Sequence, residues 1–139
     1  MPEAMTSPTP DSKEASAGRI LVVEDNVDAA ETMQMLLSIS GYETKTAYDG
    51  AAALELARAF RPQVVFLDIG LPGKDGYQVA RELRTLPEMH SALLVALTGY
   101  GQDEDRRRAS AAGFDAFQVK PVAADALETL LSDHFAARK

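Results

Sequence analysis

Short apolar runs alternate with longer segments of helical period along most of the chain. Four of the runs are rich in β-branched residues and continuously apolar, which is typical of strands buried on both faces of a sheet. These runs cover residues 20–23, 64–67, 93–97 and 116–119. A fifth segment, Glu43–Ala47, alternates mostly polar side chains and is typical of an edge strand.

The segments between these runs carry apolar residues three or four positions apart, which predicts helices. Ala30, Met33, Leu36 and Leu37 define the first helix, and Gly41 ends it as a C-terminal cap. The other expected helices cover residues 51–59, 77–86, 103–112 and 124–135. Strand and helix therefore alternate five times, which indicates an α/β fold with a parallel sheet and helices on both of its faces.

The length of 139 residues and the 46% hydrophobic content are those of one globular domain. Residues 1–18 contain three prolines and no Leu, Ile, Val or aromatic residue, so they offer almost nothing to bury. We expect these residues to form a disordered tail or linker, and residues 19–136 to form the folded domain.

Charge and composition exclude several classes of function. The net charge of −7 opposes nonspecific attraction to nucleic acid and to anionic membranes. No apolar run approaches the roughly 20 residues of a membrane span, and the amino end lacks the pattern of a signal peptide. The chain has no cysteine, and its two histidines are far apart, which argues against a transition-metal site. We expect a cytoplasmic protein that neither binds nucleic acid nor inserts into a membrane.

Polar residues follow four of the expected strands directly. Glu24 and Asp25 follow the first strand, Asp68 the third, Thr98 the fourth and Lys120 the fifth. The carboxyl ends of parallel strands lie at one edge of the sheet, where ligands bind at the point at which the strand order reverses. The sequence thus predicts that three carboxylates, a hydroxyl and an ammonium converge there.

These residue types in one place indicate phosphoryl chemistry. Three clustered acids repel one another, and a divalent cation would keep them ionised. Oxygen ligands suit Mg²⁺, Mn²⁺ or Ca²⁺, and a site with few carboxylates that also binds phosphate favours Mg²⁺. Thr98 would donate a hydrogen bond to a phosphoryl oxygen and Lys120 would neutralise it, with Asp68 as the nucleophile.

Each of these residues also has a purely structural interpretation. Asp25 or Asn26 is a natural N-cap for the first helix, and Asp68 opens a turn rich in Gly and Pro. Thr98 taken singly ends a strand, and Lys120 taken singly is a solvated surface charge.

The basic run Arg106 to Arg108 is interpreted as a solvated helix face. Asp103 and Glu104 stand four residues before Arg107 and Arg108, the spacing of ion pairs along a helix.

Four segments together resemble the signatures of bacterial response-regulator receiver domains, and the resemblance covers about residues 19–135. They are Ile20-Leu-Val-Val-Glu-Asp-Asn26, Val64-Val-Phe-Leu-Asp-Ile-Gly-Leu-Pro-Gly-Lys-Asp-Gly76, Ala96-Leu-Thr-Gly99 and Val119-Lys-Pro121. The resemblance implies a flavodoxin-like fold of five strand and helix pairs, with a sheet of order 2-1-3-4-5.

The resemblance also implies a function in a two-component system or phosphorelay. Asp68 would take a phosphoryl group from a phosphohistidine on a histidine kinase or histidine phosphotransfer protein. Asp25, Asp68 and the backbone carbonyl of Gly70 would bind Mg²⁺ or Mn²⁺, with Glu24 reaching the ion through water. The domain would act as a signalling module, and its only chemistry would be phosphorylation and dephosphorylation of Asp68.

Two departures from the commonest pattern of this family affect the expectations. Glu24 stands where many members have Asp, and it remains an oxygen ligand. Phe117 stands at the position of the switch aromatic, which is often Tyr, and has no phenolic group to anchor it outside. We therefore expect its inward and outward positions to differ little in free energy. Little sequence follows the last expected helix, so we expect output to a protein effector through the face formed by residues 103–112, 116–119 and 124–135.

Other functions remain as alternatives. A phosphatase of the haloacid-dehalogenase kind also uses an aspartate after a strand together with Mg²⁺, but it needs a second Asp where this chain has Gly70. A nucleotide-binding domain is weaker, because no phosphate-binding glycine loop follows the first strand. The chain could also be a receiver fragment of a hybrid histidine kinase, with residues 1–18 as its linker.

Overall fold

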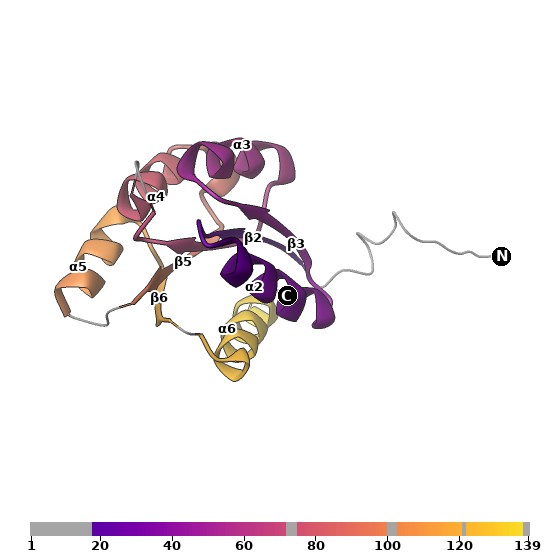
Figure 1. The fold of residues 1–139 in the computed structure, drawn as a ribbon. Coiled ribbons are helices and arrows are strands. Elements are labelled where there is room, and N and C mark those ends of the chain that lie inside the picture. Colours follow the sequence, from indigo (N-terminus) through magenta and orange to yellow (C-terminus); the bar gives the residue numbers. More distant parts are fainter. Residues whose placement is uncertain (1–17, 72–74, 100–102, 121, 138–139) are drawn as a thin grey trace.

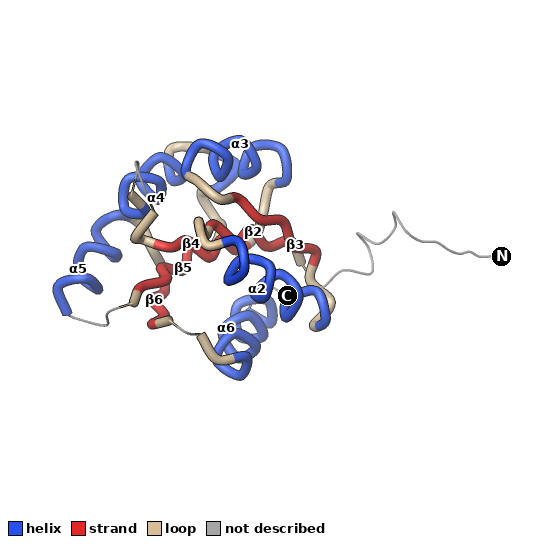
Figure 2. Tube along the Cα trace, in the orientation of Figure 1, coloured by secondary structure: helices blue, strands red, loops and turns tan. Residues whose placement is uncertain are grey.

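The computed structural model describes residues 18–71, 75–99, 103–120 and 122–137. Within them, five strands form a single sheet in which every pair is parallel (Figures 1 and 2). The strands are β2 (Arg19–Val23), β3 (Glu43–Ala47), β4 (Val64–Asp68), β5 (Leu93–Thr98) and β6 (Ala116–Val119). Their spatial order is β3-β2-β4-β5-β6, which confirms the expected order 2-1-3-4-5 and the flavodoxin-like fold.

Helices cover both faces of the sheet, as expected for a chain that alternates strand and helix (Figure 1). They are α2 (Val27–Ile39), α3 (Gly50–Phe60), α4 (Gly76–Arg84), α5 (Asp103–Ala112) and α6 (Ala124–Ala137). None of the helices in the described ranges is long and apolar enough to cross a membrane.

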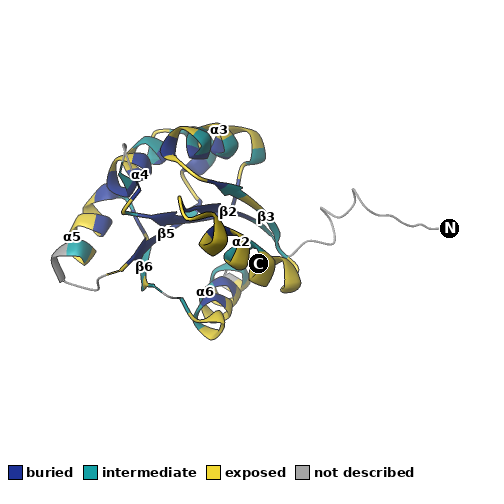
Figure 3. Cartoon of the chain, viewed as in Figure 1, coloured by how far each residue is buried: buried dark blue, intermediate teal, exposed yellow. Residues whose placement is uncertain are grey.

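Alternate residues of each central strand supply two separate cores. Leu21 and Val23 of β2 face a core shared with α3, α4 and α5, whereas Ile20 and Val22 face a core shared with α2 and α6. All residues of β4 are buried, because helices pack on both sides of it (Figure 3). Burial on both faces explains why these strands are continuously apolar in sequence.

One expectation about burial is wrong. The run at residues 116–119 was expected to be buried on both faces, but β6 is an edge strand whose residues are half-buried or, at Val119, exposed. Of the apolar residues that define α2 in the sequence, Ala30 and Leu37 are buried, whereas Leu36 is exposed. The helical period places Leu36 between the buried face and the solvent.

The element boundaries differ from the sequence expectation in two informative places. Asp68 and Thr98 are the last residues of β4 and β5, because they still pair with Leu97 and Val119 on the neighbouring strands. The helix expected at residues 77–86 ends at Arg84, and a short 3-10 helix over Pro87–Met89 follows it. Of the expected tail at residues 1–18, only Gly18 lies within the described residues, and its carbonyl accepts a hydrogen bond of 2.8 Å from the Glu43 amide.

Arg84 connects four segments at the amino edge of the sheet, a role that no sequence pattern indicated. Its guanidinium donates to the backbone carbonyls of Gly113, Met89 and Ala92 at 2.9–3.0 Å and forms an ion pair with Asp115. The Asp115 carboxylate also accepts a hydrogen bond of 2.9 Å from the Leu94 amide. One half-buried side chain thus joins the end of α4 to the starts of β5 and β6.

We predict that Arg84→Ala lowers the free energy of unfolding by about 2–4 kcal/mol, because three backbone carbonyls and a carboxylate lose their donor. Arg81→Ala is the matched control, since Arg81 lies on the exposed side of the same helix, and its effect should stay within about 0.5 kcal/mol. Urea unfolding followed by circular dichroism measures both. Equal effects of the two substitutions would show that the Arg84 contacts add nothing.

Candidate functional site

The site lies where the strand order reverses. The chain leaves β2 for β3 on one side and then returns to β4 on the other, so β2 lies between them. Glu24 follows β2 directly, and its amide donates to the Ala47 carbonyl at the end of β3 (3.0 Å). Val23 pairs with Leu67, which brings the residues after β2 beside Asp68. The carboxyl edge of the sheet therefore gathers its acids at this point, as the sequence predicted.

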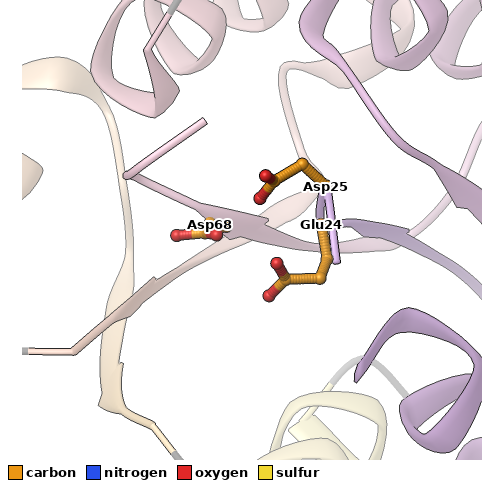
Figure 4. A group of neighbouring side chains, drawn as sticks. All are labelled: Glu24, Asp25 and Asp68. Atoms are coloured by element: carbon orange, nitrogen blue, oxygen red, sulfur yellow. The ribbon is translucent and has the colours of Figure 1, made fainter. Parts of the chain in front are cut away.

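Three carboxylates converge there (Figure 4). One oxygen from each of Glu24, Asp25 and Asp68 lies within 4.8 Å of the others. Glu24 and Asp68 are buried, with 4% and 6% of their surface exposed, whereas Asp25 is exposed. Two of the three acids are thus shielded from water, which strengthens their repulsion.

Lys120 lies against the two buried acids. Its Nζ atom is 3.1 Å from Asp68 Oδ2 and 3.1 Å from Glu24 Oε1. Its amide donates to the Thr98 carbonyl at 2.7 Å, which holds the end of β6 beside the end of β5. Lys120 is therefore a half-buried ion-pair partner of both acids, and its interpretation as a solvated surface charge is wrong.

The pKa values at the site reflect burial and charge together. Burial raises the pKa of Glu24 above its ordinary value and Asp68 raises it further, against the lowering effects of the Asn26 amide and Lys120. Burial alone would lower the pKa of Lys120, but the hydrogen bonds and charges of Asp68 and Glu24 outweigh it, so this pKa is raised. Lys120 is therefore firmly cationic at neutral pH.

The sequence left open whether Asp25 or Asn26 caps the first helix, and the structure separates the two residues. Asn26 caps α2, because its side chain accepts a hydrogen bond from the Ala29 amide at 3.0 Å. The Asn26 amide in turn donates to Glu24 Oε2 at 3.1 Å. Asp25 is not the cap, and its carboxylate lies in the acidic cluster instead.

The loop after Asp68 is held close to this carboxylate. The Gly70 amide donates to Asp68 Oδ1 at 2.9 Å. At the start of α4, a β-carbon on Gly76 would overlap the backbone of Asp68 and Ile69, so the helix approaches the end of β4 more closely than any other residue would allow. The absence of a side chain at Gly76 is therefore what permits this close approach.

A cavity of about 340 Å³ opens beside Asp68. Its lining includes Thr98, Lys120 and Gly70. Thr98 is 3% exposed, and the structure thus brings together Asp68, the hydroxyl and the ammonium that the sequence placed at this edge. Asp68, Thr98 and Lys120 are thus polar groups that share the lining of one cavity.

Phe117, which the family resemblance places at the switch position, has a cationic neighbour that sequence reasoning missed. Phe117 is half-buried, and the guanidinium carbon of Arg106 lies 4.6 Å from the centre of its ring. The ring, which has no phenolic group of its own, thus contacts a cation that neither its sequence position nor the apolar pattern indicated. The cation attracts the negative face of the ring, and it links α5 to β6.

The donor set fits a divalent cation. Glu24, Asp25 and Asp68 when ionised carry three negative charges against the single positive charge of Lys120, and all their ligand atoms are oxygens. Hard divalent cations prefer this combination. An ion bound here would relieve the repulsion that the carboxylates exert on one another.

The fold and the acidic site together are those of a receiver domain of two-component signalling. Residues 20–132 match the response regulator receiver domain family, and the chain belongs to it. The comparisons give no support to the phosphatase alternative. Receiver domains of this family act in two-component signalling, together with histidine kinases and downstream effectors.

Curated relatives include both short and long proteins. The chain is 33% identical over 103 residues to the polar-differentiation response regulator DivK of Brucella anthropi, covering 74% of this chain and 84% of that protein. It is 36% identical over 115 residues to a probable transcriptional regulator, ycf27, of Cyanophora paradoxa, covering 83% of this chain and 47% of that protein. The chain therefore spans about half the length of some curated relatives that it matches.

Solved structures agree with the fold. The chemotaxis protein CheY4 of Vibrio cholerae superposes with a TM-score of 0.80 at 26% identity, covering 84% of this chain and 97% of that one. The receiver domain of the sensor histidine kinase PA1611 of Pseudomonas aeruginosa gives a TM-score of 0.79 at 28% identity, covering 86% and 98%. That structure has a magnesium ion coordinated in its active-site cleft.

We predict that Mg²⁺ at about a hundred times its dissociation constant stabilises the wild-type protein by about 2.7 kcal/mol, because it binds only the folded state. Asp25→Asn should weaken this response, and without metal it should unfold at the same temperature or higher, since one repelling charge is gone. Asp28→Asn removes an exposed acid of α2 outside the cluster and should keep the full response. Thermal unfolding with and without Mg²⁺ tests this, and an identical Mg²⁺ response in Asp25→Asn and wild type would refute it.

Proposed function

We propose that Asp68 is the phosphoacceptor of this receiver domain. The observation that supports this proposal most is the ion pair between Asp68 and Lys120 inside a cavity that also contains Thr98. An Asp68 carboxylate oxygen attacks the phosphorus of a phosphohistidine, the P–N bond breaks, and its electron pair stays on the imidazole. The product is an acyl phosphate on Asp68, and hydrolysis of its P–O bond restores the carboxylate.

The proposal includes a resident Mg²⁺, with Mn²⁺ as a substitute. Asp25, Asp68 and the backbone carbonyl of Gly70 would hold the ion, and Glu24 would reach it through water. An ion held there would supply positive charge next to the phosphoryl oxygens. The three convergent carboxylates support this assignment, as does the magnesium in the related domain of PA1611.

Lys120 and Thr98 have separate roles in the proposal. Lys120 neutralises the phosphoryl group on Asp68, exchanging part of its present ion pairing for a phosphoryl oxygen. Thr98 donates a hydrogen bond to another of those oxygens. The protein then catalyses only its own phosphorylation and dephosphorylation, and it acts as a cytoplasmic phosphoprotein rather than on separate substrates.

The phosphodonor in this proposal is a histidine kinase or a histidine phosphotransfer protein. A cavity of about 470 Å³ lies beside the acids, between α2 and α6, and its lining joins Glu24 and Lys120 to apolar residues such as Met33, Leu36 and Leu127. A donor protein must present its phosphohistidine at Asp68, and an apolar groove next to the site offers it a surface to bury.

The output surface is proposed at α5, β6 and α6. Phe117 lies on β6, where the Arg106 contact ties the ring to α5. A movement of Thr98 toward the phosphoryl group would change the space available to this ring, and so would change the exposed face. A protein effector that recognises this face would detect phosphorylation, without nucleic-acid contact by this domain.

We predict that Asp68→Asn abolishes labelling by acetyl phosphate in the presence of Mg²⁺, since it removes the attacking carboxylate. Asp75→Asn is the matched control, because Asp75 caps α4 through its side chain and Asn caps equally well. Intact-mass spectrometry counts the phosphoryl groups. If Asp68→Asn still gains one alkali-labile phosphoryl group with the wild-type yield, the acceptor lies elsewhere.

We also predict that Thr98→Ala accepts the phosphoryl group but switches less completely. The loss of one hydrogen bond, about 1 kcal/mol, should lower the ratio of switched to unswitched molecules about fivefold. NMR spectra with and without beryllofluoride would report this as smaller shifts at Phe117 and across α5, and Thr85→Ala, remote from the site, should behave as wild type. Equal shifts in Thr98→Ala and wild type would exclude the coupling.

A further inference from the structure

Two arginines of α5, Arg106 and Arg108, lie over aromatic rings. Arg108 and its ring lie at the cavity that contains Asp68. The guanidinium carbon of Arg108 is 4.1 Å from the centre of the Tyr77 ring. Both residues line the cavity of about 340 Å³ that contains Asp68, Thr98 and Lys120. The sequence interpretation of this basic run as only a solvated face is therefore incomplete.

The position of Arg108 follows from the close packing at the start of α4. Gly76 lies against the backbone of Asp68 and Ile69, so the next residue, Tyr77, is held beside the phosphoacceptor. Tyr77 is 4% exposed, which leaves its ring little freedom to move. The ring thus provides a fixed platform that determines where the guanidinium of Arg108 lies.

The Arg108 guanidinium can still donate hydrogen bonds in this cavity. A guanidinium stacked on a ring interacts through its flat face, and the N–H groups around its edge remain able to donate. Leaving aside Asp103 and Glu104, whose side chains lie outside the described part of the structure, no carboxylate of the described residues lies within salt-bridge distance of Arg108. Asp105, one turn earlier on α5, lines the same cavity and contributes the opposite charge.

We propose that Arg108 binds the phosphodonor in this cavity. Its guanidinium attracts the dianionic phosphoryl group of a small acyl phosphate before transfer. The inference rests on the proposed function of Asp68. In the transfer from acetyl phosphate, an Asp68 oxygen bonds to phosphorus, the bond from phosphorus to the acetyl oxygen breaks, and acetate leaves with the electron pair. Arg108 takes no part in these bond changes and raises the encounter rate by its charge.

The test measures initial rates of phosphorylation by intact-mass spectrometry, since the chain contains no tryptophan to report the reaction. Arg108→Gln should lower the second-order rate constant with acetyl phosphate about three- to tenfold, because it removes one charge and whole charged clefts contribute about tenfold or more. Arg107→Gln removes the same charge from the same helix, outside the cavity lining, and should react as wild type. Arg108→Lys should recover part of the rate, because it retains the charge but not the planar group.

Two further measurements separate charge attraction from a structural effect. Asp105→Asn should raise the rate constant with acetyl phosphate. The loss of rate caused by Arg108→Gln should be smaller with the less charged donor phosphoramidate and in high salt. Melting temperatures verify that the variants are folded.

Three results would overturn the inference: equal rates for Arg108→Gln and Arg107→Gln, no gain in Asp105→Asn, or a deficit that is the same for both donors and persists in high salt. Failure of the proposed function looks different. In that case the wild-type protein would not be labelled, or Asp68→Asn would be labelled as well.

Discussion

Parallel pairing of β2 with β4, with β3 on the other side of β2, is the constraint on which the site depends. The pairing of Val23 with Leu67 sets how far each strand extends, so the acids after β2 and the acid that ends β4 reach the same point. A shift of one residue in this register would turn Asp68 toward the opposite face of the sheet. The apolar side chains of both cores fix the register, and in this way packing far below the surface determines the geometry of the acidic cluster.

The cost of this geometry is a concentration of negative charge in a place with little water. Lys120 offsets part of it by pairing with Glu24 and Asp68 together, which leaves an excess of acid. The carboxylates repel one another when no cation is bound, so the site favours the binding of positive charge. A phosphoryl group on Asp68, as proposed above, would bring still more negative charge and would increase this need for a cation.

Sequence reasoning reached the fold and most of the site for a definite reason. Strands buried on both faces must be apolar, and the polar residues that follow them, such as Asp68 and Lys120, are conspicuous by contrast. The sequence did not predict contacts that depend on the distance between two elements of the fold. The exposure of β6 follows from its place at the edge of the sheet, and the partners of Arg84 and Arg108 follow from the distance between α4 and α5. No local period encodes these distances.

The contacts of Arg84 have a mechanical consequence for α5. Arg84 binds the Gly113 carbonyl directly after this helix and Asp115 just beyond, so the carboxyl end of α5 is fastened at the amino edge of the sheet. The helix runs from there back toward the cavity of Asp68. A helix held at one end pivots about that end. A displacement that begins at the cavity would therefore be largest at the amino end of α5. Any displacement of α5 would be smallest beside Gly113, where Arg84 holds the helix end.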